Sequence, residues 1–447
     1  MTFSPAILAE HLQSIAQRAG APARFVVAFS GGLDSTAMLH ALVALKKQDT
    51  PFAAVPVLAI HVDHGLQTDS ASWGAHCRRF ALSLPVAFRT LCVNVQLESG
   101  MGPEASARNA RYSALHAELD RDDWLLSAHH REDQAETLVL NLIRGSGPAG
   151  VAGIGESRRF GPGWLVRPLL NVDRADLRDY ADTEGLEWLE DPSNTDRRFD
   201  RNFLRHEILP RLKSRWPDIA ARLQRSAAHA GEASQLLVDL AEIDFAAIGS
   251  RSERLPIDAL STLSPARQRN VIRYALRDLG LSTPTAMQLD RIQNELIPAR
   301  EDAQPLVSWS GASVRRYRNG LYLLPQDLAD VVEPTAISGT EISLGAGLGR
   351  LRFVPDADLG LDAQLLETGL VVKPRRGGEE IKLHGQAPTR KLKKLLQEEG
   401  IVPWMRERLP LLYSGDRLVA VGDLWIAAEA RAEPGVAVHW DGRPALH

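Results

Sequence analysis

The stretch RFVVAFSGGLDSTAMLH, from Arg24 to His40, decides the fold of this chain. The apolar run Phe25–Phe29 predicts a buried strand, a Ser-Gly-Gly turn follows it, and the residues after the turn have helical character. Such a strand, turn and helix form a phosphate cradle, because backbone N–H groups and the helix dipole face the anion. The loop has no lysine and lacks the Walker spacing, so it must hold phosphate in another way.

Short apolar runs and helical segments alternate through the first 190 residues. The apolar runs are Phe25–Phe29, Pro56–Val62, Val86–Val93 and Trp124–Ala128, and the helical segments are Ser35–Lys46, Ser70–Leu84, Pro103–Leu119 and Glu132–Ile143. This alternation predicts βαβ units, and hence an α/β fold with a parallel, doubly wound N-terminal sheet. Ligands of such sheets bind at the carboxyl ends of the strands, where the informative polar residues of this chain lie.

The rest of the sequence predicts three further regions after the α/β domain, which covers 1–215. They are a mainly helical domain over 216–330, a linker with small strands over 331–368, and a small α/β domain over 369–447. The sequence RNG, Arg318–Gly320, indicates a hairpin turn. Residues 371–412 hold ten Lys and Arg against five Asp and Glu, so the last domain is basic in a chain whose net charge is -4.

Cysteine content and apolar runs indicate the compartment. The two cysteines, Cys77 and Cys92, form neither a disulfide framework nor a zinc ribbon, and their scarcity fits a reducing cytosol. The N-terminus lacks the basic region and long apolar core of a signal peptide. No run reaches the ~18 apolar residues that a membrane span needs. We therefore expect a cytoplasmic protein without a membrane partner.

The residues of the glycine loop suggest how it would bind an anion. Gly31 and Gly32 let the backbone turn tightly, and Ser30 and Ser35 add hydroxyl donors. Asp34 would repel phosphate unless a cation lies between them. Mg²⁺ accepts one or two carboxylates together with phosphate oxygens, so Asp34 is a candidate Mg²⁺ ligand. The alternative is an ordinary turn in which Ser30 or Asp34 caps the helix.

The loop sequence SGGLDS resembles the signature of the N-type ATP pyrophosphatases, the PP-loop family. Further motifs, in this order, are similar to those of the bacterial tRNA(Ile)-lysidine synthase family: HVDHGLQ (61–67), EASARNARY (104–112), SAHHREDQAETLVLNLIRGSG (127–147), RPLL (167–170) and DPSNTDRRFDRNFLRHEILPRL (191–212). The C-terminal KPRRGGEEIKL, RKLKKLLQEEGIVPWMRERLPLL and GDRLVAVGDLWI extend the resemblance over nearly the whole chain. Gln67 departs from the pattern, because an arginine is expected after HGL.

The resemblance implies a ligase that forms a C–N bond. The loop binds the β,γ-pyrophosphate of ATP, and the C2 carbonyl oxygen of the wobble cytidine in a tRNA(Ile) with a CAU anticodon attacks the α-phosphorus. The ε-amine of free L-lysine then displaces AMP, and the lysidine formed changes reading from AUG to AUA and identity from methionine to isoleucine. The implied cofactors are ATP and Mg²⁺. The implied partners are the tRNA and lysine, with a homodimer as an option for the assembly.

The residues themselves and the resemblance together give the predicted site residues. The residues predicted to bind ATP are Ser30, Gly31, Gly32, Leu33, Asp34, Ser35, His61, Asp63 and His64. Catalysis falls on Asp34, Arg108, His129, Asp133 and Glu136, with Asp34 and Asp133 as Mg²⁺ ligands. Binding of tRNA falls on Arg201, Asn202, Arg205, Arg375, Arg376, Lys391, Lys393 and Lys394.

Taken by themselves, several of these residues allow a second interpretation. Asp133 and Glu136 share a helix face at spacing i, i+3, which suits a metal or an ammonium group but also complements the helix dipole. His129 is a candidate base for the lysine amine, which is mostly protonated near neutral pH, and equally a structural histidine. The cluster of His61, Asp63 and His64 suits a nucleotide pocket better than zinc, because no further Cys or His group completes four ligands.

The arginines and lysines likewise allow a simpler interpretation. Arg108 and Arg111 share a helix face that suits phosphate or nucleotide, and the resemblance favours Arg108. Charge runs such as 197–205 and 371–412 are often solvated surface rather than RNA-binding patches. Trp404 could stack on RNA, although a tryptophan is more often a core residue.

Two other functions remain open at this point. Another PP-loop enzyme that modifies tRNA, such as a 2-thiolase, would need a sulfur relay, and two distant cysteines without a Cys-x-x-Cys motif argue against it. A non-catalytic protein that binds ATP and tRNA would not need Asp34, Asp133 and Glu136. Turnover of ATP to AMP would discriminate the latter from an enzyme.

Overall fold

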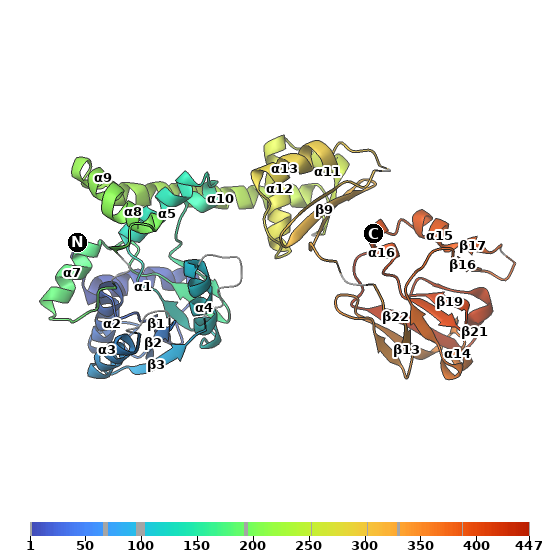
Figure 1. Ribbon diagram of the computed structural model, residues 1–447, viewed down its shortest axis with the longest axis horizontal. Coiled ribbons are helices and arrows are strands. Elements are labelled where there is room, and N and C mark those ends of the chain that lie inside the picture. Colours follow the sequence, from blue (N-terminus) through green and yellow to red (C-terminus); the bar gives the residue numbers. More distant parts are fainter. Residues whose placement is uncertain are drawn as a thin grey trace. The chain divides into compact units, whose positions relative to one another are not determined.

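The structure is a computed structural model that describes residues 2–65, 70–94, 103–191, 195–251, 253–301, 303–328, 331–386 and 388–446. Gln67, the departure from the family pattern, lies outside these residues. The described chain divides into two compact units, Met1–Leu236 and Leu237–His447 (Figure 1). No helix among the described residues is long and apolar enough to cross a membrane.

A six-stranded sheet forms the centre of the first unit (Figure 1). Its strands are β1 (Phe25–Ala28), β2 (Val57–Asp63), β3 (Ala87–Cys92), β4 (Trp124–Leu126), β5 (Ser157–Phe160) and β6 (Gly163–Val166). Their order is β3-β2-β1-β4-β6-β5, and all neighbours pair in parallel except β5 with β6. The predicted parallel, doubly wound sheet is confirmed. Its strand order reverses between β1 and β4, and ligand crevices of such sheets lie at this point.

Helices cover both faces of this sheet. They are α1 (Pro5–Ala19), α2 (Leu33–Ala44), α3 (Ser70–Ser83), α4 (Pro103–Ala117), α5 (Arg131–Ile143), α6 (Pro148–Val151) and α7 (Arg174–Thr183), with a 3-10 turn at Leu45–Lys47. Alternate residues of β1 enter different cores: Phe25 and Val27 pack with Leu12 of α1, and Val26 packs with Leu115 of α4. A strand buried on both sides has no polar face, which is why β1 reads as a continuous apolar run.

Strands β5 and β6 were not predicted from the sequence. The four residues of β5 include two exposed arginines, Arg158 and Arg159, and β5 pairs only at the edge of the sheet. The four residues of β6 follow the turn Gly161–Pro162, and its apolar stretch is short. Neither segment has the length or alternation that marks a strand.

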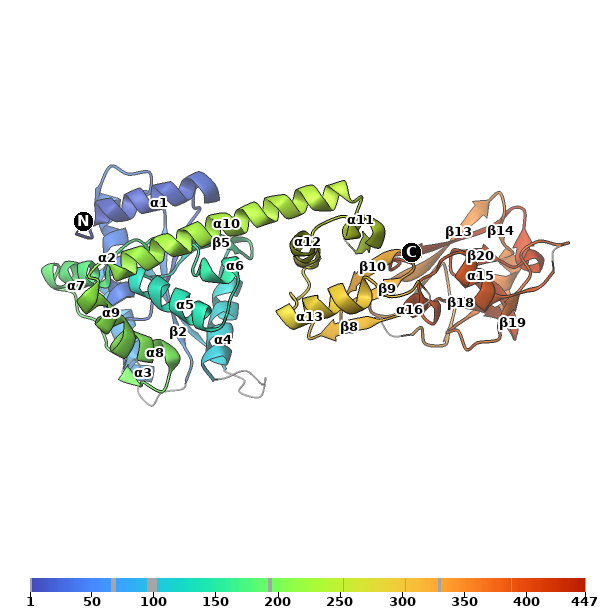
Figure 2. The same ribbon diagram turned by 90° about the horizontal axis from the view of Figure 1, so that it is seen from above.

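The first unit continues into a run of helices after α7. They are α8 (Asp200–Phe203), a π-helical turn η3 (Leu204–Ile208), α9 (Leu209–Arg215) and the long α10 (Ile219–Ala247), within which the two units divide (Figure 2). The segment between α7 and α8 returns to the glycine loop, where the Leu189 N–H donates to the Gly31 carbonyl at 2.9 Å. Residues distant in sequence therefore meet at the carboxyl end of β1.

The second unit begins with helices packed on a four-stranded sheet of order β7-β10-β9-β8. The elements are β7 (Arg254–Pro256), α11 (Ile257–Ser261), α12 (Pro265–Asp278), α13 (Ala286–Arg291), a π-helical turn η4 (Ile292–Leu296), β8 (Leu306–Trp309), β9 (Ala312–Tyr317) and β10 (Gly320–Leu324). Strands β9 and β10 pair antiparallel with Tyr317 opposite Gly320. The predicted hairpin turn at 318–320 is confirmed.

Two five-stranded sheets form the remainder of the second unit, in the orders β11-β15-β18-β19-β20 and β12-β13-β22-β14-β21. Their strands are β11 (Thr335–Ala336), β12 (Glu341–Ser343), β13 (Arg350–Ala357), β14 (Gly360–Leu361), β15 (Val371–Lys373), β18 (Leu411–Ser414), β19 (Arg417–Val421), β20 (Trp425–Ile426), β21 (Arg431–Ala432) and β22 (Gly435–Asp441). A separate pair is formed by β16 (Glu380–Ile381) and β17 (Arg390–Lys391), and the helices are α14 (Ala363–Thr368), α15 (Leu392–Glu398), α16 (Pro403–Arg406) and a 3-10 turn at Ala428–Ala430.

Strands from 335–361 pair with strands that follow residue 370. Strand β11 pairs with β15, and β13 pairs with β22. Residues that the sequence assigned to a linker with small strands therefore contribute to the C-terminal sheets. The predicted domain boundaries themselves stay predictions.

Candidate functional site

The glycine loop, residues 30–35, is held by hydrogen bonds from two other segments of the chain. Gly31 has a φ of +77°, and a Cβ at this position would lie 2.7 Å from Cys77 Sγ. The Trp73 indole N–H donates to the Ser30 carbonyl at 2.7 Å. The Leu189 N–H holds the Gly31 carbonyl from the other side. Only glycine fits at position 31, so the loop shape depends on contacts with α3 and with the segment before α8.

The N-terminus of α2 follows this loop without a side-chain cap. Its N-cap residue is Gly32, and no side chain forms a cap hydrogen bond there. Ser35 Oγ donates to the Gly32 carbonyl at 3.1 Å and lies 3.1 Å from Ser30 Oγ. The alternative in which Ser30 or Asp34 caps the helix is therefore wrong. The positive end of the α2 dipole is left for an external anion.

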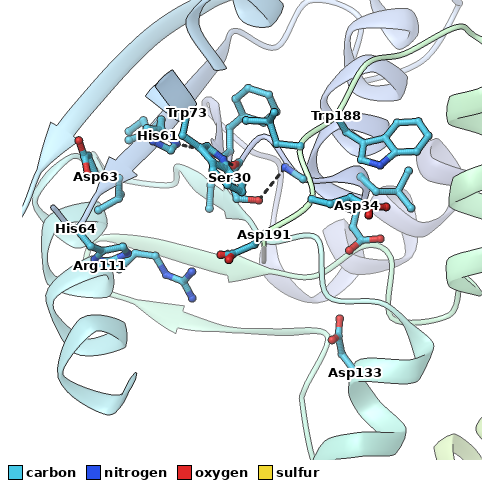
Figure 3. Close-up of a pocket in the computed structure, with 18 of the residues that line it drawn as sticks. Ser30, Asp34, His61, Asp63, His64, Trp73, Arg111, Asp133, Trp188 and Asp191 are labelled. Atoms are coloured by element: carbon cyan, nitrogen blue, oxygen red, sulfur yellow. Dashed lines mark hydrogen bonds between the residues drawn. The ribbon is translucent and has the colours of Figure 1, made fainter. Parts of the chain in front are cut away.

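A first cavity of about 570 Å³ opens beside this helix start (Figure 3). Its lining includes most of the residues predicted to bind ATP: Ser30, Gly32, Leu33, Asp34, His61, Asp63 and His64. Figure 3 places Asp63 and His64 on the opposite side of the cavity from Asp34 and Trp188. Gly31 does not line this cavity, and Ser35 lines only a second, neighbouring cavity. The volume is in the usual range for a small-molecule site.

A second cavity of about 600 Å³ lies at the ends of β1 and β4. It shares Ser30, Asp34, Arg111 and Asp133 with the first cavity. Its other walls include Ser127, Ala128 and His129 after β4, and Phe199, Arg201 and Asn202 near α8. The two cavities meet at the end of β1, so a ligand phosphate there would be in reach of a second ligand bound near β4.

Asp34 lies where the two cavities meet. Burial raises the pKa of its carboxyl, while His130 and Arg174 oppose that rise. Its Oδ2 lies 3.8 Å from His130 Nε2, and its Oδ1 lies 3.5 Å from Arg174 Nε. Oδ1 is buried and has no hydrogen-bond partner among the described residues. A buried carboxylate oxygen without a partner is costly, which favours a cationic ligand at this point.

Asp133 and Glu136 of α5 are held by two arginines. Asp133 Oδ1 accepts hydrogen bonds from Arg201 at 3.0 Å and from Arg205 at 3.1 Å. Glu136 is fully buried and accepts from Arg201 Nε and Arg205 Nε, both at 2.7 Å. Asp133 Oδ2 accepts the backbone N–H of His130 at 2.9 Å, which caps α5. The two carboxylates thus serve the helix start and also an ion-pair cluster.

This cluster fixes the charge of Asp133. Burial alone would raise the pKa of its carboxyl, but His130 and Arg201 outweigh burial and hold the pKa at about 2. The carboxylate is therefore ionised at any physiological pH. Arg201 and Arg205, which the sequence predicted to bind tRNA, donate hydrogen bonds to these carboxylates. Both arginines also line the second cavity. Asn202 is buried, and its amide donates to the Asp196 carbonyl at 2.9 Å.

The pKa of the His129 imidazole lies well below its usual range. Burial is the largest cause that lowers its pKa to about 3, and Arg167 and Arg201 act in the same direction. Its Nδ1 lies 2.8 Å from Ser127 Oγ. A group with so low a pKa is a poor proton acceptor for an ammonium group. The geometry therefore favours a hydrogen-bonding role for His129 at the wall of the second cavity over the predicted role of general base.

His61 and Asp63 at the end of β2, and His64 directly after it, line the first cavity but differ in their hydrogen bonds. Burial lowers the pKa of His61, whose Nδ1 lies 3.1 Å from the Phe29 carbonyl. Asp63 accepts the Gly65 N–H at 2.9 Å. Burial also lowers the pKa of His64, whose Nδ1 is buried without a hydrogen-bond partner among the described residues. His61 thus contacts the backbone directly before the glycine loop. The Nδ1 of His64, without a partner among the described residues, could bind a ligand.

The structure separates Arg108 from Arg111. Arg111 lines the first and second cavities, whereas Arg108 is exposed and lines a third cavity further along α5. The sequence indicated that the two share a face but favoured Arg108. Sequence reasoning also missed residues of the first cavity that lie outside the quoted signatures: Trp73, Arg174, Arg178, Trp188, Leu189 and Glu190. Their only signal is position near the quoted motifs.

Similarity to known protein domains and to whole proteins identifies the family. Residues 6–212 match the PP-loop domain, residues 255–322 the TilS substrate binding domain and residues 370–440 the TilS substrate C-terminal domain. A tRNA(Ile)-lysidine synthase of Alkalilimnicola ehrlichii is 42% identical over 439 residues, which are 97% of this chain and 96% of that protein. The chain belongs to the tRNA(Ile)-lysidine synthase family. Proteins of the same name from Methylococcus capsulatus and Coxiella burnetii are each 40% identical, over 93% and 89% of this chain and 95% and 88% of their own lengths.

The PP-loop domain of this family member implies ATP, and its donor set allows a test of fit for Mg²⁺. The Oδ1 of Asp34 accepts no hydrogen bond from a described residue, although Arg174 Nε lies 3.5 Å away, and it lies beside the uncapped start of α2. Asp133 lines the same cavity. One or two carboxylates beside a phosphate cradle suit Mg²⁺. Asp34 fits better than Asp133, because both oxygens of Asp133 accept hydrogen bonds from the protein, whereas Oδ1 of Asp34 accepts none from a described residue.

The predicted tRNA contacts of the C-terminal domain are unequally exposed. Lys391, Lys393 and Lys394 are exposed at β17 and α15, and Arg376 is exposed as well. The side chain of Arg375 is only 13% exposed, and its Nε lies 3.3 Å from Glu379 Oε2. Arg375 therefore holds its own loop, and the other four residues are the ones that present charge to solvent. Trp404 is buried, as the simpler interpretation of that residue predicted.

Proposed function

We propose that this chain ligates the ε-amine of free L-lysine to C2 of the wobble cytidine in a tRNA(Ile) with a CAU anticodon. The reaction consumes ATP and releases pyrophosphate and AMP through an adenylylated tRNA. The product changes codon reading from AUG to AUA and charging identity from methionine to isoleucine. The observation that carries the proposal is the 42% identity over 97% of the chain to a tRNA(Ile)-lysidine synthase.

The first step follows from the two joined cavities. ATP lies in the first cavity with its pyrophosphate at the uncapped start of α2 and near Ser30. Asp34 would hold Mg²⁺, which supplies charge neutralisation for the pyrophosphate. The cytidine enters the second cavity, and its C2 oxygen attacks the α-phosphorus where the cavities meet. Arg111, which lines both cavities, donates to the α-phosphate.

The second step brings lysine to the adenylylated cytidine. The ionised Asp133 on the wall of the second cavity attracts the substrate cation, and the neutral His129 hydrogen-bonds near the reacting base. The amine, after it has released its proton to solvent water, attacks C2. The C2–O bond to the adenylyl group breaks, and AMP leaves toward the first cavity. Positioning of the reactants supplies most of the rate enhancement, because both nucleophiles come from substrates.

The cysteines support this reaction over sulfur transfer. Cys77 is buried against the glycine loop, and burial raises the pKa of its thiol to about 12. A sulfur relay needs an accessible thiolate, which Cys77 does not provide. Cys92 is exposed at the end of β3, with no second exposed cysteine to form a relay pair.

The decisive experiment supplies labelled lysine, ATP with Mg²⁺, and a tRNA(Ile) transcript with a CAU anticodon. We expect alkali-stable label on the tRNA and an equal amount of AMP. A transcript in which uridine replaces the wobble cytidine should accept no label. The variant Asp34→Ala should form no AMP while it still binds tRNA, and Asp49→Ala, an exposed aspartate after α2, should match the wild type.

Two outcomes would contradict parts of the proposal. AMP without label on the tRNA would point to a different nucleophile, and normal AMP formation by Asp34→Ala would remove the assigned role of Asp34. The assembly is a separate question. A homodimer predicts twice the chain mass in solution, which light scattering of the purified protein measures.

A further inference from the structure

A third cavity of about 410 Å³ adjoins the second cavity along α5. The two cavities share three lining residues, His129, Phe199 and Arg201. Phe199 therefore lies between the space assigned to the reacting cytidine and a further space outside it. The role of this third cavity is not explained by ATP, lysine or the cytidine.

Phe199 is an exposed aromatic side chain on a fixed backbone. Phe199 is 43% exposed and is the N-cap residue of α8. Its carbonyl accepts the Phe203 N–H at 2.9 Å, and its own N–H donates to the Asp196 carbonyl at 3.4 Å. No core cluster of the described residues includes it. The backbone at Phe199 is thus held by hydrogen bonds, while its ring belongs to none of the core clusters.

The third cavity carries positive charge that no carboxylate among the described side chains neutralises. Arg108 and Arg144 line it, both are exposed, and neither forms an ion pair with a described side chain. Arg198 and Arg201 also line it but are paired with carboxylates, and Asp200 is the one acidic residue in the lining. Two unpaired guanidinium groups suit a phosphate. They also disfavour lysine as the occupant, because its ammonium group would be repelled.

We propose that Phe199 is a stacking platform for the nucleotide next to the wobble cytidine, and that Arg108 and Arg144 contact its phosphate. This inference rests on the proposed function. The cytidine must leave the stack of the anticodon loop to present its C2 oxygen in the second cavity. An aromatic ring at the boundary replaces the stacking that its neighbour loses, as in other proteins that bind single-stranded RNA.

The test combines a protein variant with a changed RNA. Wild type and Phe199→Ala are compared on tRNA(Ile) transcripts that are intact or that lack the base on the 5′ or on the 3′ side of the wobble cytidine. We expect Phe199→Ala to lower kcat/KM for intact tRNA by roughly 5- to 150-fold. Removal of one of the two neighbouring bases should cause a similar loss in the wild type. The two losses should not add, because both remove the same contact.

Three controls make the result specific to stacking. Phe199→Trp should recover most of the activity because it keeps an aromatic ring. Phe203→Ala removes another exposed phenylalanine of α8, which lines neither cavity, and should match the wild type. Arg144→Gln should raise KM for tRNA and lower the salt slope of log K by about 1, since one phosphate contact is lost.

Several outcomes would overturn the inference. They are wild-type kcat/KM for Phe199→Ala, losses that add for both abasic transcripts, or an effect of Phe199→Ala on KM for lysine instead of tRNA. Wild type and Phe199→Ala can also be compared on the intact and abasic transcripts by tRNA binding alone, without ATP and lysine. This binding measurement decides the inference even if the wild type transfers no lysine. Failure of the proposed function is thereby distinguishable from failure of the stacking platform.

Discussion

Arg205 holds Glu136 through two donors, with Nε 2.7 Å from Oε1 and a terminal nitrogen 3.0 Å from Oε2. The carboxylate is fully buried, and the arginine side chain is 24% exposed. Because Arg201 donates to the same carboxylate, Glu136 anchors the helices α8 and η3 to α5. A carboxylate engaged in this way supports the wall of the second cavity, and it has little free capacity to bind a metal.

The first prediction concerns this anchor. Glu136→Gln should lower the unfolding free energy by about 1–3 kcal/mol, because two partly buried arginines lose their main partner. We also expect a higher KM for tRNA, since Arg201 and Phe199 line the cavities near α8. Urea unfolding and steady-state kinetics measure the two effects.

A matched control for this variant is Glu207→Gln. Glu207 also pairs with two arginines, Arg197 and Arg211, but those partners are 66% and 80% exposed. Exposed pairs contribute little, so Glu207→Gln should stay within about 0.5 kcal/mol of the wild type. Equal effects of the two variants would show that burial of Glu136 adds nothing to the anchor.

The second prediction concerns pH. The pKa of His129 falls from 6.5 in the unfolded chain to about 3 in the folded protein, first through burial. The unfolded state therefore binds more protons between these values, and the stability from this residue is present above pH 6.5 and lost as pH falls toward 3. Between pH 7 and pH 5 the loss should be about 2 kcal/mol.

The variant His129→Gln isolates this contribution. His40, His61 and His64 have lowered pKa values as well, whereas the pKa of His130 is raised, so the pH dependence of the wild type does not come from His129 alone. The difference between the wild type and His129→Gln, measured by urea unfolding at both pH values, cancels the other histidines. The same pH dependence in both proteins would mean that His129 is not buried in its neutral form.

The sheet was predictable because its signals are local. Each of the first four parallel strands is an apolar run, and each is followed by a helix of sufficient length, so the periodicity of the sequence carries the topology. The edge pair β5 and β6 lacked such a signal. The glycine loop was predictable for the same reason, since strand, turn and helix are contiguous from Phe25 onward.

The partners of the site residues were not predictable from local patterns. The spacing of Asp133 and Glu136 indicated a shared face, but their arginine partners lie 65 to 72 residues further along the chain. Only the packing of α8 on α5 brings them together. For the same reason the sequence favoured Arg108, whereas Arg111 lines both cavities, because the choice depends on which one faces the end of β1.

The third prediction concerns the basic helix α15. Its leucines 392, 395 and 396 are buried, so the helix is anchored by one face, and Lys393 and Lys394 are exposed. Charge reversal of both lysines should raise KM for tRNA and flatten its salt dependence, while KM for ATP stays unchanged. Charge reversal of Lys46 and Lys47, two adjacent lysines after α2, should leave the kinetics unchanged. Unaltered tRNA kinetics in the Lys393 and Lys394 variant would mean that α15 is only solvated surface.

The last prediction concerns Trp404, which could be either a core residue or an RNA platform. Its ring centroid lies 5.1 Å from that of Tyr322 and 6.5 Å from that of Tyr317, and the residue is 8% exposed. Trp404→Ala should therefore lower the unfolding free energy of the second unit by about 3–5 kcal/mol, and Trp404→Phe by less, since the cavity left is smaller. Trp216→Ala removes a tryptophan that is 45% exposed and should have little effect on unfolding. Weaker tRNA binding by Trp404→Phe at unchanged stability would identify Trp404 as an RNA contact instead.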